Sequence, residues 1–450
     1  MRFLSHHAFA LLLTTSLSAI AHADDWPKWM GPTSDGVYAE PGVVTELPSK
    51  GLNVKWRVPV AGGYSGPSVW GDRVYLFDYV KSEGQAFNNP GQRAELKGSE
   101  RLLCIDTKSG KTLWKYEYEC PYSISYPAGP RCTPTIDSDG PNDTGRVYLL
   151  GSEGDLNCLN ATTGELIWKR NFKKDYKASV PLWGFSAHPL VEDGLVYCMV
   201  GGPGQTVVAF DKMTGEERWK ALSASAAGYC PPSMVTFGGE KQLVVWHADA
   251  IVGMAPATGK PFWKLDIKPE YEMSITKPQR EGNLMYASGI RNHSVLFELA
   301  SDKPAVSELW RGEPKQSVYC ANSTPLIRGG VIYGTDCNEG CLIAVDTKTG
   351  ERLWTSFLPT RPEEKRRVSH GTAFITRLGD SDDFLLMSEI GDLIRAKLTA
   401  DGYSETWRFH VLEPTGEAFG RAAVWSHPAY AQGTAFIRND KELVAVQLTE

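Results

Sequence analysis

Histidine is the side chain best suited to proton transfer and metal binding near neutral pH, and the chain contains nine of them. Five lie beside short apolar runs, at His188, His247, His293, His370 and His427. Five other side chains able to do chemistry occupy comparable positions, namely Arg131, Trp246, Asp249, Arg291 and Glu389. Brought together, these ten residues would form a polar site for a small molecule, a peptide, an anion or a metal ion.

These residues also have a simpler interpretation. Pairs such as His188-Pro189 and Ser426-His427 can satisfy backbone groups where strands begin, or can lie in solvent. The histidines show none of the close spacings of a metal site. We therefore predict no metal ligand and no catalytic residue, and a ligand site only where the fold gathers the ten side chains.

The elements that would position these side chains follow from a repeat. A phrase of the form D-x-x-[TS]-G-x-x-x-W recurs, for example at residues 106–114, 211–219 and 346–354. Aligning the chain on the closing tryptophan gives eight anchors, at Trp56, Trp114, Trp168, Trp219, Trp263, Trp310, Trp354 and Trp407. Self-similarity of this kind indicates a repeat architecture, so we expect eight structural units.

Each unit reads as four short strands. An apolar run follows a proline, two further apolar strands come next, and the fourth strand carries the tryptophan. One small sheet cannot bury both of its faces, whereas eight sheets packed radially cover one another. We predict an all-β fold, an eight-bladed β-propeller of four-stranded antiparallel blades.

The two ends of the chain are predicted to meet in one blade. The last unit supplies three strands before the chain ends, whereas Trp56 stands before the first complete unit. The N-terminal strand should complete the final blade and close the ring, which removes exposed sheet edges. In the repeated phrase, the Asp can cap the turn, the Gly can adopt a positive φ, and the Trp offers a flat surface to the next sheet.

In such a ring, the loops before first strands and the turns between second and third strands share one face, around the mouth of the channel. All ten candidate residues fall in loops of these two kinds. Ligand sites form where many loops converge on a concavity. The mouth is therefore the predicted site.

The N-terminal region divides into two predicted parts. Residues 1–23 combine Arg2, an apolar stretch and Ala21-His22-Ala23, which is typical of a cleavable signal peptide. No cysteine follows the cleavage site, so we expect no lipid anchor. Residues 24–51 form a leader that we expect to pack across the outside of the ring, and residues 52–450 form the propeller. The protein is predicted to be periplasmic or secreted.

A polar stretch of 20 residues, Lys81 to Glu100, interrupts the first unit between its second and third strands. Loops of this length in a compact fold tend to be lids or to be disordered. Because the stretch leaves the ring on the mouth side, we consider a lid or a partner contact, and solvated disorder is the alternative.

Charge and cysteine content narrow the classes of partner and compartment. The net charge of −6 disfavours nucleic acid, and beyond the N-terminal stretch no run is long and apolar enough to span a membrane. An oxidising compartment would allow disulfides between Cys337 and Cys341 and between Cys120 and Cys132. Three other cysteines stand among apolar strand residues and are expected to fill the core: Cys104, Cys158 and Cys198.

The repeated phrase resembles the tryptophan-docking motif of pyrroloquinoline-quinone (PQQ) repeat propellers, and the resemblance covers almost the whole chain after residue 23. It implies either a quinoprotein dehydrogenase or a non-catalytic scaffold similar to the propeller lipoprotein of the outer-membrane β-barrel assembly machine. The enzymes hold PQQ with Ca²⁺, and many carry adjacent cysteines or a C-x-x-C-H haem motif, both absent from this sequence. The acidic residues Asp249, Asp336 and Glu389 form no recognisable catalytic set.

Three functions remain open. The first is an exported, monomeric, non-catalytic propeller that binds a protein, peptide or glycan partner in the cell envelope. The second is a PQQ-dependent alcohol dehydrogenase with a minimal site for PQQ and Ca²⁺. The third, a hydrolase or lyase that uses histidine and arginine at the mouth, is disfavoured because no placed acid and base can be identified.

Overall fold

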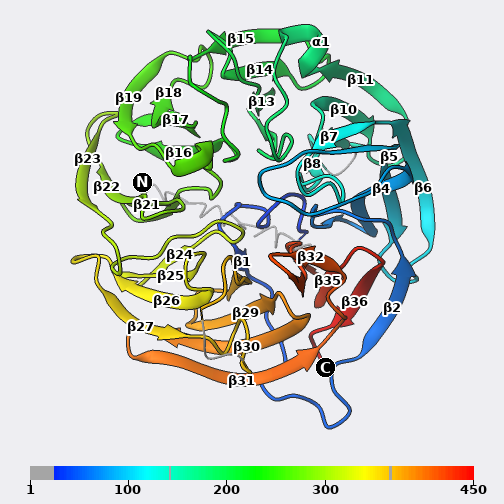
Figure 1. The fold of residues 1–450 in the computed structure, drawn as a ribbon, viewed down its shortest axis with the longest axis vertical. Coiled ribbons are helices and arrows are strands. Elements are labelled where there is room, and N and C mark those ends of the chain that lie inside the picture. The colour runs from blue at the N-terminus through cyan, green and yellow to red at the C-terminus, as the bar shows by residue number, and fades with distance from the viewer. Residues whose placement is uncertain (1–24, 141–142, 364–366) are drawn as a thin grey trace, which may run out of the picture.

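The computed structural model describes residues 25–140, 143–363 and 367–450. Figure 1 shows small sheets arranged radially around one axis. Within the described residues there are eight such sheets, and in each the four principal strands run antiparallel from the axis outward. The predicted eight-bladed β-propeller is confirmed, whereas the predicted signal peptide, residues 1–23, lies outside the described residues.

The first four blades follow the chain from its N-terminal half. Blade 1 contains β3 (Ser68–Trp70), β4 (Arg73–Glu83), β5 (Ala94–Asp106) and β6 (Thr112–Glu119). Blade 2 contains β8 (Thr135–Asp137), β9 (Arg146–Leu150), β10 (Asp155–Asn160) and β11 (Leu166–Asn171). Blade 3 contains β12 (Leu190–Glu192), β13 (Leu195–Met199), β14 (Val207–Asp211) and β15 (Glu217–Ala221). Blade 4 contains β16 (Ser233–Phe237), β17 (Glu240–Trp246), β18 (Ala250–Met254) and β19 (Pro261–Asp266).

The other four blades complete the ring. Blade 5 contains β20 (Gln279–Glu281), β21 (Leu284–Ser288), β22 (Ser294–Leu299) and β23 (Val306–Arg311). Blade 6 contains β24 (Leu326–Arg328), β25 (Val331–Asp336), β26 (Cys341–Asp346) and β27 (Arg352–Ser356). Blade 7 contains β28 (Ala373–Leu378), β29 (Asp383–Ser388), β30 (Asp392–Thr399) and β31 (Gly402–His410). Blade 8 contains β34 (Ala429–Ala431), β35 (Thr434–Arg438), β36 (Glu442–Gln447) and β2 (Val54–Pro59).

A few short elements lie outside this pattern. They are β1 (Val37–Tyr38), β7 (Tyr122–Ile124), the hairpin β32 (Gly416–Ala418) and β33 (Arg421–Ala423), the helix α1 (Phe172–Tyr176) and the 3-10 turn η1 (Glu270–Glu272). No helix among the described residues has the length and apolar character needed to cross a membrane.

The ring closes by pairing the two ends of the propeller, as the sequence predicts. Strand β2 runs antiparallel to β36, from Val54 opposite Val446 to Pro59 opposite Glu442. The N-terminal strand is thus the outer strand of blade 8. Because the pairing consumes the free edges of the first and last units, the ring is held by sheet hydrogen bonds rather than by a loop.

Each of the eight repeat tryptophans lies on the outer strand of a blade, and six of them contact the turn of the neighbouring blade. The indole Nε1 of Trp263 instead donates to Gln242 of its own blade, and that of Trp407 donates to the Val44 carbonyl of the leader. The indole Nε1 of Trp56 donates to the Thr107 carbonyl of blade 1 at 2.9 Å, and Trp168 bonds Lys212 of blade 3 in the same way at 3.1 Å. The glycine of the neighbouring turn lies against the indole ring of the tryptophan: a Cβ on Gly164 would come within 2.5 Å of Trp114. That glycine has φ +76°, which also favours glycine.

The aspartates of the repeated phrase cap the same turns. The carboxylate of Asp211 accepts hydrogen bonds from the backbone N–H groups of Met213 and Thr214, both at 2.9 Å. Asn160, which replaces the Asp in blade 2, accepts equivalent bonds from residues 162 and 163. These local bonds fix the turn that receives the preceding blade's tryptophan.

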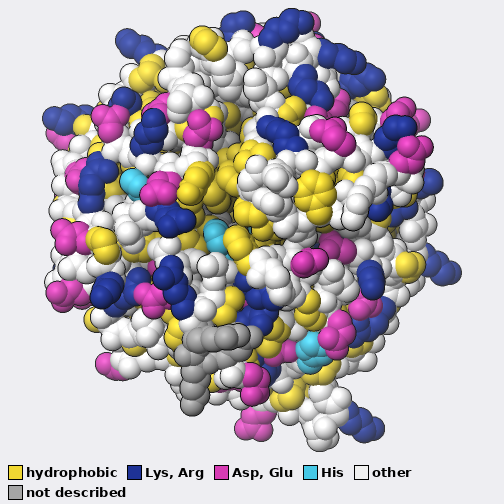
Figure 2. Space-filling view, viewed as in Figure 1, with side chains coloured by type: hydrophobic (Ala, Val, Ile, Leu, Met, Phe, Trp, Pro, Cys, Tyr) yellow, Lys and Arg dark blue, Asp and Glu magenta, His cyan; other side chains and the backbone are white. Residues whose placement is uncertain are grey.

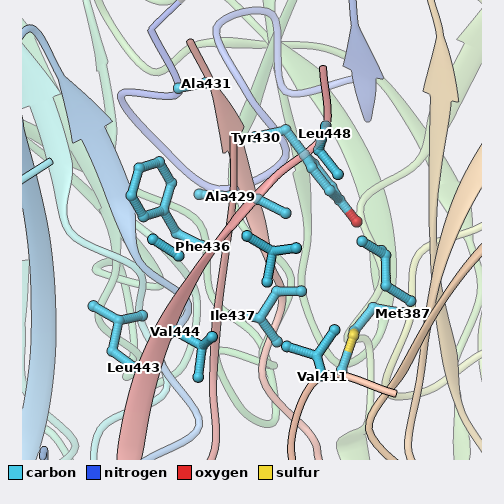
Figure 3. Close-up of a cluster of buried hydrophobic side chains, with 14 of the residues drawn as sticks. Met387, Val411, Ala429, Tyr430, Ala431, Phe436, Ile437, Leu443, Val444 and Leu448 are labelled. Atoms are coloured by element: carbon cyan, nitrogen blue, oxygen red, sulfur yellow. The ribbon is translucent and has the colours of Figure 1, made fainter. Parts of the chain in front are cut away.

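The hydrophobic core consists of layers between adjacent blades. Figure 3 shows parts of two such layers: Met387 of β29 lies on the side of blade 8 that carries Ile437, whereas Leu443 lies on its opposite side. The central strands are buried on both faces and therefore read as nearly continuous apolar runs. Burial of this kind leaves the strand ends and loops as the places where function can reside.

Residues 26–38 of the leader lie along the axis of the ring, so the expectation that the leader packs across the outside is wrong for this part. Figure 1 shows this segment, coloured blue, running through the middle of the propeller. Strand β1 pairs in parallel with β28, Trp26 forms a bridge with Val69 of β3, and the Pro27 carbonyl accepts from Ile136 of β8. All three partners belong to innermost strands. Trp26 is only 3% exposed, so its large apolar ring is removed from water at the axis. Farther along, the leader reaches the outer strand β31, where Trp407 donates to the Val44 carbonyl.

Half of the predicted insertion Lys81–Glu100 forms strand, so the disorder alternative is wrong for that half. Strands β4 and β5 extend into it and leave residues 84–93 as the connecting loop, and β5 pairs with β7. Its last residue, Glu100, is fully buried and accepts hydrogen bonds from Tyr118, Tyr122 and the Ser152 N–H. Burial raises the pKa of this carboxyl.

All nine cysteines are unpaired and buried, so neither predicted disulfide forms. Cys120 belongs to an apolar cluster with Tyr79 and Tyr122, whereas Cys132 packs into the core of blades 2 and 3. Cys337 and Cys341 likewise point into separate clusters. The prediction that Cys104, Cys158 and Cys198 fill the core is confirmed, since none is exposed to solvent.

Candidate functional site

A pocket of about 1070 Å³ occupies the mouth of the ring. Loops from blades 1 to 8 and one residue of the leader line it. Figure 2 shows hydrophobic side chains gathered around the hollow at the centre of this face, with charged side chains mostly farther out. We call this cavity the mouth pocket. The lining residues with aromatic side chains, histidine included, are Trp29, Tyr64, Tyr126, Trp183, His188, Tyr229, Tyr271, His370, Phe419, Trp425 and His427.

The pocket floor is made by Trp29, His188 and His427. The Trp29 indole stacks on the His188 ring, with centroids 4.8 Å apart, and meets the His427 ring edge-on at 5.4 Å. Neither ring nitrogen of His188 has a hydrogen-bond partner within the described residues. Burial lowers the pKa of both histidines to about 3. The floor is therefore aromatic and uncharged at neutral pH, and the leader closes the channel at this point.

One wall is an aromatic cluster from blades 7, 8 and 1. The His370 ring stacks on Phe419 with centroids 4.8 Å apart and an interplanar angle of 4°, and Tyr126 lies 6.1 Å from Trp425. Phe419 stands at the tip of the β32–β33 hairpin and is 43% exposed. Burial lowers the pKa of His370 to about 4. This histidine is thus also neutral, and it serves as an aromatic surface.

Arg131 lines the pocket, but its donors are already used. Its guanidinium donates to the backbone carbonyls of Gly129, Ser125 and Tyr126 at 2.5 to 2.8 Å, and its cation lies 5.1 Å from the Tyr64 ring centroid. Burial lowers its pKa. Because these carbonyls occupy the N–H donors of the guanidinium, Arg131 stabilises the loop at residues 125–129 and has no donor pair left for an anion.

Glu389 supports the wall from behind. Its fully buried carboxylate accepts hydrogen bonds from Arg361 and Arg421, each at 2.9 Å from the Nε atom, and from Trp425 Nε1 at 3.3 Å. It does not line the pocket. The two guanidinium groups neutralise it, so it positions Trp425 and the β32–β33 hairpin.

Besides Glu389, four of the ten predicted residues lie away from the pocket. Trp246 is fully buried in the apolar core of blades 4 and 5. His247 accepts from the Asp249 N–H at 3.2 Å, and burial lowers its pKa. The Asp249 carboxylate accepts from the N–H and hydroxyl of Ser225, and the backbone bond lowers its pKa. Burial likewise lowers the pKa of His293, which is not among the lining residues.

The fold therefore brings together five of the ten predicted residues at the pocket: Arg131, His188, Arg291, His370 and His427. Arg291 stands on the rim, where its side chain is 58% exposed and lies 3.8 Å from Glu270 of η1. Lys268 and Glu272 line the same side. Apart from Arg131, the charged lining residues thus lie along one edge of the pocket.

The ten predicted residues include none of the tryptophan, tyrosine and phenylalanine residues that line the pocket. Trp183 and Tyr229 meet edge-to-face at 5.6 Å, and Trp425 and Phe419 complete the opposite wall. These aromatic residues stand outside the repeated phrase, so alignment on the repeat passes over them. The available signal was the occurrence of tryptophans, at 183 and 425, just before first strands.

The two extended hairpins meet above this wall. Asn88, in the loop between β4 and β5, donates to the Glu417 carbonyl of the β32–β33 hairpin, and Ser125 donates to the Asn89 carbonyl at 2.5 Å. Pro90 and Gly91 of the same loop line the pocket. The loop at residues 84–93 thus forms part of the rim.

The lining does not fit PQQ bound through Ca²⁺. Calcium prefers six to eight oxygen ligands, several of them carboxylate, yet the carboxylates on the pocket are Glu270 and Glu272, both exposed on the rim. The buried carboxylates Glu389 and Asp336 are paired with arginines. Within the described residues, no three histidine, cysteine or acidic side chains converge as a metal site.

The fold and site define a PQQ-type β-propeller with an aromatic pocket at its mouth. A family model described as outer membrane protein assembly factor BamB matches residues 98–356, which is more than half of the chain. The chain belongs to this family.

Individual relatives are more distant. The chain is 29% identical over 157 residues to the quinohemoprotein alcohol dehydrogenase ADH-IIG of Pseudomonas putida, covering 34% of this chain and 20% of that protein. It is 22% identical over 246 residues to BamB of Burkholderia pseudomallei, covering 46% and 62%. The crystal structure of a quinohemoprotein alcohol dehydrogenase from Comamonas testosteroni superposes with a TM-score of 0.60 at 13% identity, covering 94% and 80%, which shows a shared fold. The chain thus matches less than two thirds of the length of either curated relative.

Proposed function

We propose that this protein is an exported, non-catalytic propeller that binds a partner in the cell envelope through its mouth pocket. The aromatic pocket itself carries the proposal: it is large, open at one face and ringed by loops from every blade. Pockets that bury rigid aromatic surface with a few polar groups are typical binding sites. The resemblance to an assembly factor of the outer membrane supports an envelope location.

A binding role is favoured over catalysis because the groups that could act as acid or base are engaged or aromatic in function. The three pocket histidines serve as ring surfaces with lowered pKa values, Arg131 is held by carbonyls, and Glu389 is paired. General acid–base catalysis needs a group whose pKa lies near the working pH and within reach of substrate. The leader's Trp29 also blocks the channel beneath the pocket.

The alternative is a PQQ-dependent alcohol dehydrogenase, supported by the quinoprotein relatives. Titration with PQQ and Ca²⁺ tests it directly. Our proposal predicts no saturable quinone binding and no dye-linked alcohol oxidation. Saturable binding accompanied by oxidation would overturn the non-catalytic proposal.

The binding proposal is tested by capture from envelope extract. Immobilised protein should retain a component that Trp183→Ala loses and that Phe262→Ala keeps. Phe262 is a matched control because it is an aromatic residue, 36% exposed, on the outer strand β19 and away from the pocket. Equal retention by all three proteins would remove the mouth pocket from the proposal.

A further inference from the structure

The walls of the mouth pocket are unusually aromatic. Tryptophan, tyrosine and phenylalanine account for eight of its 28 lining residues, whereas they make up 11% of the whole chain. Trp183 and Tyr229 present one aromatic pair, and Phe419 and Trp425 another. Such rings offer rigid, flat, amphipathic contact area at low entropic cost. A ligand with flat apolar faces suits these walls.

The polar groups that remain unengaged in the pocket are neutral. Within the described residues, Trp183 Nε1 and the Ser186 hydroxyl make no hydrogen bond to the protein. The side-chain oxygen of Asn322 accepts none either, although its amide nitrogen donates to Thr372 at 3.2 Å. Indole N–H donates, an amide oxygen accepts, and a hydroxyl does both. These groups complement a ligand whose own groups both donate and accept.

Deep in the pocket, no charged side chain is free to bind a charged ligand. Arg131 gives its hydrogen bonds to carbonyls, and the floor histidines are neutral. The other charged lining residues all belong to one stretch of the rim and include both signs, namely Lys268, Glu270, Glu272 and Arg291. A deeply bound anion or cation would therefore lose its hydration without gaining a counter-charge.

We propose that the mouth pocket binds a neutral glycan, whose sugar rings stack on the aromatic walls while their hydroxyls bond Trp183, Ser186 and Asn322. This inference rests on the proposed binding function and names its ligand class. A pyranose ring has a flat face of C–H groups and an edge of hydroxyls, which matches both features. The volume of about 1070 Å³ lies at the upper end for ligand pockets and accommodates several sugar rings.

The test is isothermal titration of the full chain after removal of any signal peptide, with maltohexaose, cellohexaose and chitohexaose as neutral probes. A trigalacturonate serves as the acidic probe and an apolar decapeptide as the peptide probe. We expect at least one neutral hexasaccharide to bind, Trp183→Ala to weaken it about tenfold or more, and Phe262→Ala to leave it unchanged. Ser186→Ala should weaken it less, by about two- to tenfold.

Several results would overturn the glycan proposal. They are the absence of neutral-glycan binding at about 10 mM, binding that Trp183→Ala does not weaken, or tighter binding of the acidic sugar or the peptide. If Trp183→Ala does not fold, Phe419→Ala replaces it, since Phe419 is exposed at a hairpin tip. Should the glycans fail while the extract component is still captured through the pocket, the ligand class is wrong and the binding function stands. If capture also fails, both are wrong.

Discussion

The Trp29 indole lies against the His188 imidazole, with ring centroids 4.8 Å apart and ring planes 21° apart. Trp29 comes from the leader and His188 from the loop before β12, so the contact joins the N-terminal segment to blade 3 across the axis. It also makes the leader the floor of the mouth pocket. The segment therefore contributes to the site as well as to the fold.

Acid should destabilise the protein through the floor histidines. The folded-state pKa of His188 and of His427 is about 3, whereas the unfolded value is about 6.5. A depressed histidine pKa means that the unfolded chain binds the proton first, so their stabilising contribution is complete above about pH 6.5 and falls between about pH 6.5 and 3. Chemical denaturation at several pH values measures this loss.

Replacing these histidines provides the control for the acid experiment. In the double variant His188→Phe, His427→Phe, the free energy of unfolding should depend less on pH between about pH 6.5 and 3. The slope should correspond to close to two fewer protons taken up on unfolding. His410→Gln removes a histidine whose side chain is 49% exposed and should leave the steep slope in place. A slope that is the same in the double variant and the original protein would contradict the assignment.

Gly164→Ala should destabilise the ring at a blade junction. The added Cβ would approach Trp114 to 2.5 Å, and the residue has φ +76°. Gly194→Ala is the matched variant, because its φ is +79° and nothing lies within 4 Å of the added Cβ. Both should lose about 1 kcal/mol to backbone strain. The Gly164 variant should lose a further 1 to 3 kcal/mol, roughly, from overpacking, as measured by urea unfolding. Equal losses would mean that the tryptophan contact is not tight.

Glu389→Gln should remove the buried carboxylate that holds two arginines in the wall. Arg361 and Arg421 both bond this carboxylate, and breaking such a pair costs about 3 to 5 kcal/mol. Glu413→Gln, whose side chain is 83% exposed, should change the free energy of unfolding by less than about 0.5 kcal/mol. If the two variants unfold at the same denaturant concentration, the Glu389 carboxylate does not stabilise the wall.

Replacing residues 85–92 by two glycines should preserve the fold and weaken partner capture. The loop makes few apolar contacts, yet Pro90 and Gly91 line the pocket and Asn88 reaches the β32–β33 hairpin. The deletion is shorter than the whole stretch from Lys81 to Glu100, because Glu100 is buried in the core. Retention of the extract component measures the effect, and unchanged retention together with an unchanged melting temperature would show that the rim loop is dispensable.

The fold could be predicted from the sequence because its contacts repeat. Trp56 to Trp407 recur at blade intervals, and each occupies the same outer-strand position. The site could be predicted only in part, because its residues do not repeat. Trp246 ends β17 and His247 follows it at the mouth-side turn, but Trp246 packs into the core of blades 4 and 5, and the buried His247 does not line the pocket. Whether a loop side chain faces the channel or its own blade depends on how it packs, and the repeat pattern does not predict that packing.

The leader shows a second limit of sequence reasoning. The aromatic residues Trp26, Trp29 and Tyr38 correctly indicated a packed segment, since all are buried. They did not indicate whether it packs outside or along the axis, because both surfaces are apolar where blades meet. The partners that decide the matter, Val69 and the strand β28, lie far along the chain.

Hydrogen–deuterium exchange in the presence of the captured envelope component tests the central claim, binding at the mouth, most directly. We predict slower exchange at residues 182–188 and 416–427, which border the pocket, and unchanged exchange at the outer strands β15 and β19. Protection confined to the outer strands, or no protection at the mouth under saturating ligand, would contradict the proposal that this propeller binds its partner through the mouth pocket.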